Sequence, residues 1–130
     1  MIVIESSAMV DALVGEPVNP RLLALLADED LHAPALIDFE VASALRGHVR
    51  GGKLKPARLD GAIHDFAALQ IERHQMTNLL RHILRLRNNF TAYDAAYVVL
   101  AQALGAAVVT ADAKLEEARR LGVDVRVFTP

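Results

Sequence analysis

Two spacings of hydrophobic residues alternate along the chain. Short runs of consecutive apolar residues, many of them β-branched, are typical of strands buried in a parallel sheet. Between these runs, apolar residues recur at every third or fourth position, as in amphipathic helices. The runs predict strands over residues 2–4, 31–33, 70–73, 106–110 and 123–128.

The intervening stretches predict helices with recognisable capping residues. Asn19 precedes Pro20, which suits the first helical position, and Thr91 stands three residues before Asp94 in a capping-box pattern. Thr77 is a further predicted cap. The predicted helices cover residues 7–14, 20–28, 35–50, 56–69, 78–86, 92–104 and 114–121. Strands that alternate with helices indicate a parallel sheet covered on both faces by right-handed crossovers.

The composition fits one domain, residues 1–130, that buries a core without disulfides. The chain is 53% hydrophobic and its mean hydropathy is +0.26, which suits a protein that covers one face with a partner. No apolar run reaches the roughly 18 residues of a membrane span. The start lacks the basic segment of a signal peptide, and the absence of cysteine excludes thiolate zinc sites. We therefore expect a cytoplasmic protein without a membrane segment.

Four acidic residues stand where predicted elements begin or end: Glu5, Glu40, Asp94 and Asp112. Glu5 and Asp112 each follow a strand, so both point to the edge at which open parallel sheets bind ligands. Glu40 lies in an apolar segment, whereas Asp94 and Asp112 have helix capping as a competing role. Clustered carboxylates repel each other, and a hard divalent cation removes that cost. If the four acids meet, they favour a small metal-dependent nuclease.

Several sequence blocks carry a resemblance to a known family. The blocks are 2–8, 33–34 with 39–46, 91–97 and 109–115. They resemble PIN-domain ribonucleases of the VapC type, which are the toxins of type II toxin–antitoxin systems, and the match runs from end to end. The resemblance implies a PIN-like three-layer α/β/α fold, with a short central parallel sheet covered by helices on both faces.

Carried across position by position, the resemblance implies a catalytic site that binds Mg2+ or Mn2+ through Glu5, Glu40, Asp94 and Asp112. Ser7 and Thr110 would be nearby hydroxyls that orient carboxylates or water. The implied activity is cleavage of RNA, often a tRNA or ribosomal RNA, by metal-activated water. Members of the family form homodimers, and a cognate antitoxin blocks them by placing its tail in the active groove.

Any contacts to RNA phosphates have to come from local basic patches. The formal net charge is −2, which does not indicate a generally basic nucleic-acid-binding domain. The candidate contacts are Arg46, Arg50, Arg81, Arg85 and Arg87. The same arginines also fit the solvated faces of amphipathic helices, so both interpretations stay open.

Position 5 departs from the family pattern, in which the first acid is normally aspartate. The extra methylene of Glu5 moves the carboxylate by roughly 1.5 Å, comparable with a misplacement that costs about 10²-fold in rate. One alternative is therefore a PIN-fold binding subunit with weak or no catalysis. The sequence alone decides neither for nor against it.

Two further interpretations find less support. A phosphoacceptor receiver module also needs strand-end acids, a metal and a lysine such as Lys114, but no acid follows the predicted strand near Arg73. The histidines show no ligand pair at i, i+4, so we expect most of them to be solvated or half-buried and assign none to a metal. They are His32, His48, His64, His74 and His82.

Overall fold

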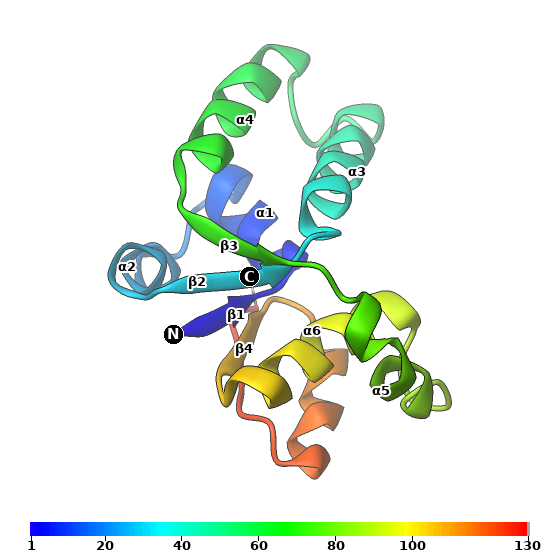
Figure 1. The fold of residues 1–130 in the computed structure, drawn as a ribbon. Coiled ribbons are helices and arrows are strands. Elements are labelled where there is room, and N and C mark those ends of the chain that lie inside the picture. Colours follow the sequence, from blue (N-terminus) through cyan, green and yellow to red (C-terminus); the bar gives the residue numbers. More distant parts are fainter. Residues whose placement is uncertain (130) are drawn as a thin grey trace.

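The computed structural model describes residues 1–129 and contains a five-stranded sheet in which every neighbouring pair of strands is parallel (Figure 1). The strand order is β3-β2-β1-β4-β5. The strands are β1 (Ile2–Ile4), β2 (Leu31–Pro34), β3 (Ile71–His74), β4 (Ala107–Thr110) and β5 (Val125–Val127). The first strand therefore lies in the centre of the sheet, with later strands added on one side and then on the other.

Helices cover both faces of this sheet. Figure 1 shows α1, α3 and α4 on one face and α5 and α6 on the other. The α-helices are α1 (Ser6–Val14), α2 (Pro20–Asp28), α3 (Ile37–Arg50), α4 (Leu59–Ala68), α5 (Leu80–Arg85) and α6 (Ala92–Leu104). The predicted three-layer α/β/α fold is thus confirmed. Among the described residues, no helix combines the length and the apolar character needed to cross a membrane.

Three segments form 3-10 helices, and they account for the differences from the predicted helices. They are η1 (Pro56–Arg58), η2 (Thr77–Leu79) and η3 (Ala113–Leu121). The prediction that Thr77 caps a helix is wrong, because η2 begins at Thr77 and the preceding Met76 makes no side-chain capping bond. Short 3-10 turns of this kind are common at the start of α-helices.

The segment η3 was expected to be an ordinary α-helix. Its charged residues pair at the three-residue spacing that a 3-10 helix brings into line. Arg119 lies 3.6 Å from Glu116, and Arg120 lies 3.6 Å from Glu117. These surface pairs contribute little energy individually, but they agree with the tighter winding.

The core is built around the central strands and α6. The three residues of β1 and the four of β4 are all buried. In α6, the residues from Ala95 to Ala101 are buried without interruption, so this helix is enclosed on all sides. Its small alanine side chains allow close packing against β1, β2 and β4. A helix placed this rigidly fixes the position of the residues at its start, including Asp94.

The order of the strands creates a switch point between β1 and β4. The chain continues from β1 to β2 on one side, and β4 pairs with β1 on the other. The backbone N–H of Glu5 donates to the carbonyl of Val109 at 2.9 Å, which ties the two strand ends together. Ligands bind at such a point in open parallel sheets, outside the carboxyl ends of the strands.

Candidate functional site

Glu5 occupies the switch point and accepts hydrogen bonds from several donors. Its side chain caps α1, and only 6% of the residue is exposed. Oε2 accepts from the backbone N–H of Ser7 at 3.0 Å, from the Thr110 hydroxyl at 2.8 Å and from the Ser7 hydroxyl. Oε1 accepts from the Ser6 hydroxyl at 3.0 Å. These donors hold a buried carboxylate in one position and offset part of its desolvation.

The end of β4 is tied into the same network. Thr110 is fully buried, and its Oγ1 accepts the backbone N–H of Asp112 at 2.9 Å. The Ser7 hydroxyl accepts the N–H of Ala111 at 3.0 Å. Asp112 caps η3 through the N–H of Lys114 at 3.0 Å, and the Lys114 ammonium lies 3.7 Å from its other oxygen. The capping role foreseen for Asp112 is therefore present, and the residue still lies beside the cluster.

Glu40 reaches the cluster from the first turn of α3. It is half-buried, and the Tyr97 hydroxyl donates to its Oε1 at 2.7 Å. Burial is the main cause that raises the pKa of Glu40; the hydrogen bond from Tyr97 opposes it, and the charges of Glu5 and Asp94 raise the pKa further. Burial of the phenol raises the pKa of Tyr97, and the hydrogen bond to Glu40 and the charges of Glu40 and Glu5 raise it further, which keeps the phenol protonated as a donor.

Asp94 joins from the start of α6. Its backbone N–H donates to the Thr91 hydroxyl at 3.1 Å, as the capping-box pattern predicted. Burial raises the pKa of the Asp94 carboxyl first, the charges of Glu5 and Asp112 raise it further, and Lys114 lowers it. The charge of Glu5 thus acts on both Glu40 and Asp94. The structure brings the four predicted acids into one electrostatically coupled group, which we call the acidic cluster.

Two residues in this network were not predicted to contact the acids. Ser6 donates to Glu5, and Tyr97 positions Glu40. Tyr97 follows Asp94 by three positions, so both lie on one face of α6, and that spacing was the available signal. The predicted contacts of Ser7 and Thr110 with the acids are present. The roles of the acids as catalytic residues and metal ligands stay predictions.

The donor chemistry of the acidic cluster fits a hard divalent cation. Four carboxylates lie together with one nearby ammonium, that of Lys114. Their mutual repulsion adds to the effect of burial in raising the pKa values of Glu40 and Asp94. Oxygen ligands of this kind suit Mg2+ or Mn2+. Among residues 1–129, the potential metal-ligand atoms found within 4.8 Å of one another belong to a different group of side chains.

That other group is formed by His32, Glu72 and His74. His32 is only 5% exposed, so it is an exception to the expectation that most of the histidines are solvated or half-buried. Helical spacing alone does not reveal this group. Glu72 and His74 are two apart on a strand, which places both on one face of the sheet beside His32.

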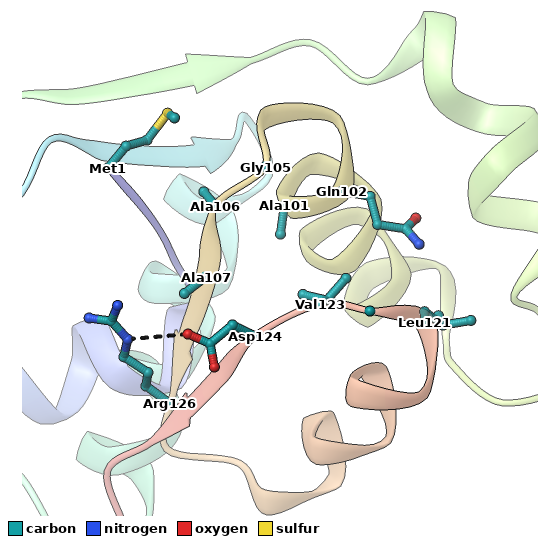
Figure 2. Close-up of a pocket in the computed structure, with 11 residues that line it drawn as sticks. Met1, Ala101, Gln102, Gly105, Ala106, Ala107, Leu121, Val123, Asp124 and Arg126 are labelled. Carbon is teal, nitrogen blue, oxygen red and sulfur yellow. Dashed lines mark ion pairs between the residues drawn. The ribbon is translucent and has the colours of Figure 1, made fainter.

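A hollow of about 610 Å3 lies at the opposite edge of the sheet, beside the amino ends of β4 and β5 (Figure 2). Two of its lining side chains, Asp124 and Arg126, form an ion pair at 3.6 Å. Much of the remaining lining is small or apolar, such as Ala101, Ala107 and Val123. Because parallel sheets carry their reactive groups at the other edge, we do not place the function in this hollow.

Comparisons with known proteins agree with the geometry. Residues 2–121 match the family model described as PIN domain. The chain is 38% identical over 117 residues to VapC ribonuclease Mb0985 of Mycobacterium bovis, covering 90% of each chain. It is 36% identical over 118 residues to ribonuclease VapC3 of Mycobacterium tuberculosis, covering 90% of this chain and 86% of the relative. Identity to ribonuclease VapC1 of the same organism is 33% over 127 residues, 96% of each chain.

Replacing one acid of the cluster should stabilise the metal-free protein. The pKa of Asp94 is raised on folding, so its charged form is less favourable in the folded than in the unfolded state. The stability linked to its proton is fully present below the unfolded pKa and is lost as pH rises through the folded pKa. We therefore expect Asp94→Asn to unfold at a higher denaturant concentration than the native chain at pH 7 in EDTA. As pH falls through the raised pKa, the free energy of unfolding of the native chain should rise relative to that of the mutant.

The control is Asp65→Asn, which removes an exposed carboxylate from α4. This variant should unfold at the same denaturant concentration as the native chain. Equal unfolding midpoints for the native chain, Asp94→Asn and Asp65→Asn at pH 7 would contradict the idea that the acidic cluster is under electrostatic strain.

Proposed function

Because the chain belongs to the PIN-domain family and, within it, to the VapC group, we propose that it is a metal-dependent endoribonuclease. The observation that carries the proposal is the convergence of Glu5, Glu40, Asp94 and Asp112 at the switch point of the sheet, with raised pKa values at Glu40 and Asp94. Relatives named as ribonucleases support RNA as the substrate. Membership of this family leaves the receiver-module alternative without support.

Mg2+ or Mn2+ bound by the acidic cluster would supply an activated water and neutralise charge on the scissile phosphate. The protein's part is to hold the oxygens in place. Ser6, Ser7 and Thr110 fix the Glu5 carboxylate, and Tyr97 fixes that of Glu40. A carboxylate with a raised pKa is also a better acceptor for the proton of the attacking water, which suits Glu40 and Asp94.

Water's oxygen then bonds to phosphorus as the bond to the 3′ oxygen breaks. The expected products are a 5′-phosphate and a 3′-hydroxyl, with the leaving oxygen protonated from solvent.

The five candidate arginines are suited to phosphate contacts. Arg46 and Arg50 lie on α3, and Arg81, Arg85 and Arg87 lie on α5 or just after it; all five are exposed. None of them forms an ion pair with the described residues, whereas Arg58, Arg73, Arg119, Arg120 and Arg126 all do. Unpaired guanidinium groups are available for RNA phosphates and would make binding dependent on salt.

Exposed apolar side chains support protein partners and unpaired RNA bases. Phe39 precedes Glu40 and is 79% exposed, and Tyr93 precedes Asp94 and is 65% exposed. Aromatic rings beside a nuclease site can stack on the bases of single-stranded RNA loops, such as those of tRNA or ribosomal RNA.

Leu80 and Leu84 on α5 are also exposed. In our proposal, a cognate antitoxin and a second copy of the chain cover apolar surface of this kind, and the protein acts as a cytoplasmic toxin.

One observation favours a second candidate, a PIN-fold binding subunit with weak catalysis. Three of the donors to Glu5 converge on Oε2. Oε1 accepts one bond, from Ser6, and is the oxygen better placed to bind an ion. The bonds to Oε2 therefore leave less of the Glu5 carboxylate available to an ion.

The first prediction for the proposed nuclease concerns its metal and Asp94. The purified chain should cleave a structured RNA with Mg2+ or Mn2+ and lose this activity in EDTA. Asp94→Asn should slow cleavage by about 100-fold or more, because the asparagine amide carries no negative charge and offers a cation one oxygen instead of two. Mapping of the fragment ends identifies the site and the 5′-phosphate. Asp65→Asn is the control, and full activity of a folded Asp94→Asn would contradict the proposal.

A second prediction separates the nuclease from the binding subunit. If the native chain is an active nuclease, Glu5→Asp should change the single-turnover rate by less than about tenfold. If Glu5 misplaces the carboxylate, the shorter side chain should raise the rate by about 10²-fold. A large gain on Glu5→Asp would thus favour the binding-subunit alternative for the native protein.

A third prediction concerns RNA affinity. Arg85→Gln, made in the inactive Asp94→Asn chain, should weaken RNA binding and lower the slope of log affinity against log salt concentration by about 1. Arg126→Gln is the matched control, since Arg126 is paired with Asp124 at the opposite edge of the sheet (Figure 2). Equal slopes for the two arginine variants would remove Arg85 from the RNA-binding surface.

A further inference from the structure

His32, Glu72 and His74 bring three potential ligand atoms to one point on the sheet, apart from the acidic cluster. His32 pairs with Glu72 in the register of β2 and β3, and His74 follows Glu72 by two positions, so the three side chains share one face. His32 Nδ1 lies 2.9 Å from His74 Nε2 and 3.4 Å from Glu72 Oε2. All three ligand atoms lie within 4.8 Å of one another.

These separations are close to those of ligands around a single small cation. Two nitrogens that each lie about 2.0–2.1 Å from a tetrahedral Zn2+ are about 3.3 Å apart. The pair from His32 to Glu72 already matches this value, and the two imidazoles need to part by only a few tenths of an ångström. His74 is only partly buried, whereas His32 is buried, so we assign this movement to His74.

A fourth residue orients the buried histidine. His32 Nε2 lies 3.1 Å from Asp30 Oδ2, and the His32 side chain is 7% exposed whereas that of Asp30 is 77% exposed. A carboxylate at Nε2 favours the tautomer with its proton on that nitrogen, which leaves the lone pair of Nδ1 directed at His74 and Glu72. A carboxylate behind a ligating histidine is a frequent arrangement in metal sites.

From this geometry we infer that His32, Glu72 and His74 form a binding site for a late first-row divalent cation of the Zn2+ type. Two imidazoles and one carboxylate suit such ions and do not suit Mg2+, which prefers oxygen ligands. The side chain of Glu72 is 66% exposed, so the remaining coordination position opens to water. The site is independent of the proposed nuclease activity.

A bound ion would join the edge strand to the rest of the sheet. β3 has one neighbouring strand, β2, and contributes two of the three ligands. The ion would therefore link β3 to β2 by side chains in addition to backbone hydrogen bonds. Binding to the folded state alone also stabilises it.

The test is calorimetric titration of the full chain with Zn2+ in the presence of excess Mg2+, which is added to compete for the acidic cluster. We expect one Zn2+ per chain and a higher melting temperature in its presence. Asp94→Asn should keep this binding. His74→Gln, chosen because His74 is less buried than His32, should abolish it, and Asp30→Asn should weaken it by about 10- to 100-fold.

The matched control is His64→Gln, which removes an exposed histidine from α4. It should bind Zn2+ as the native chain does. Absence of Zn2+ binding by the native chain, or unchanged binding in His74→Gln, would overturn the site. If Asp94→Asn loses Zn2+ binding and His74→Gln keeps it, the ion belongs to the acidic cluster, and the proposed site at His32, Glu72 and His74 is equally overturned. Cleavage of RNA by His74→Gln with Mg2+ is measured separately, so the failure of either proposal is recognisable.

Discussion

The candidate site depends on the pairing of β1 with β4 in the middle of the sheet. This parallel pair places the residue after β1 next to the last residues of β4. The hydrogen bond from the Glu5 N–H to the Val109 carbonyl fixes the register of the two strand ends. Thr110 then donates to Glu5 and accepts from the backbone of Asp112, so one buried hydroxyl aligns both acids. The remaining acids are brought in by α3 and α6, the latter enclosed by the core. The position of the cluster is thus a consequence of topology and packing.

The same arrangement puts stability and proposed function in opposition. Glu5 is well supplied with donors, whereas the carboxyls of Glu40 and Asp94 have raised pKa values, chiefly because of burial and secondarily because of their acidic neighbours. A fold selected only for stability would neutralise or remove one of these groups. Retaining them makes physical sense if a cation completes the site, and this is why the electrostatic strain supports the proposal together with the family match.

Much of this could be predicted from the sequence because the signals were local or came from the resemblance. The apolar run of β1, the cap at Thr91 and the acids at strand ends each depend on residues close together in the chain. The spacing of Asp94 and Tyr97 places both on one face of α6, but the contact from Tyr97 to Glu40 spans two helices, so no local signal predicts that Glu40 is its partner. The group of His32 and His74 depends on the register of β2 and β3, and a search at helical spacing cannot detect ligands that alternate along a strand. The 3-10 winding of η3 was missed because its apolar pattern also fits an α-helix.

The hydrogen bond from Tyr97 to Glu40 has an optical consequence. The chain contains two tyrosines and no tryptophan, so the fluorescence excited in the tyrosine absorption band comes from Tyr93 and Tyr97. Tyr93 is in solvent, and Tyr97 is buried with its phenol on a carboxylate of the cluster. The protein thereby carries an intrinsic chromophore in direct contact with its proposed reaction centre, and events at Glu40 are open to label-free spectroscopy.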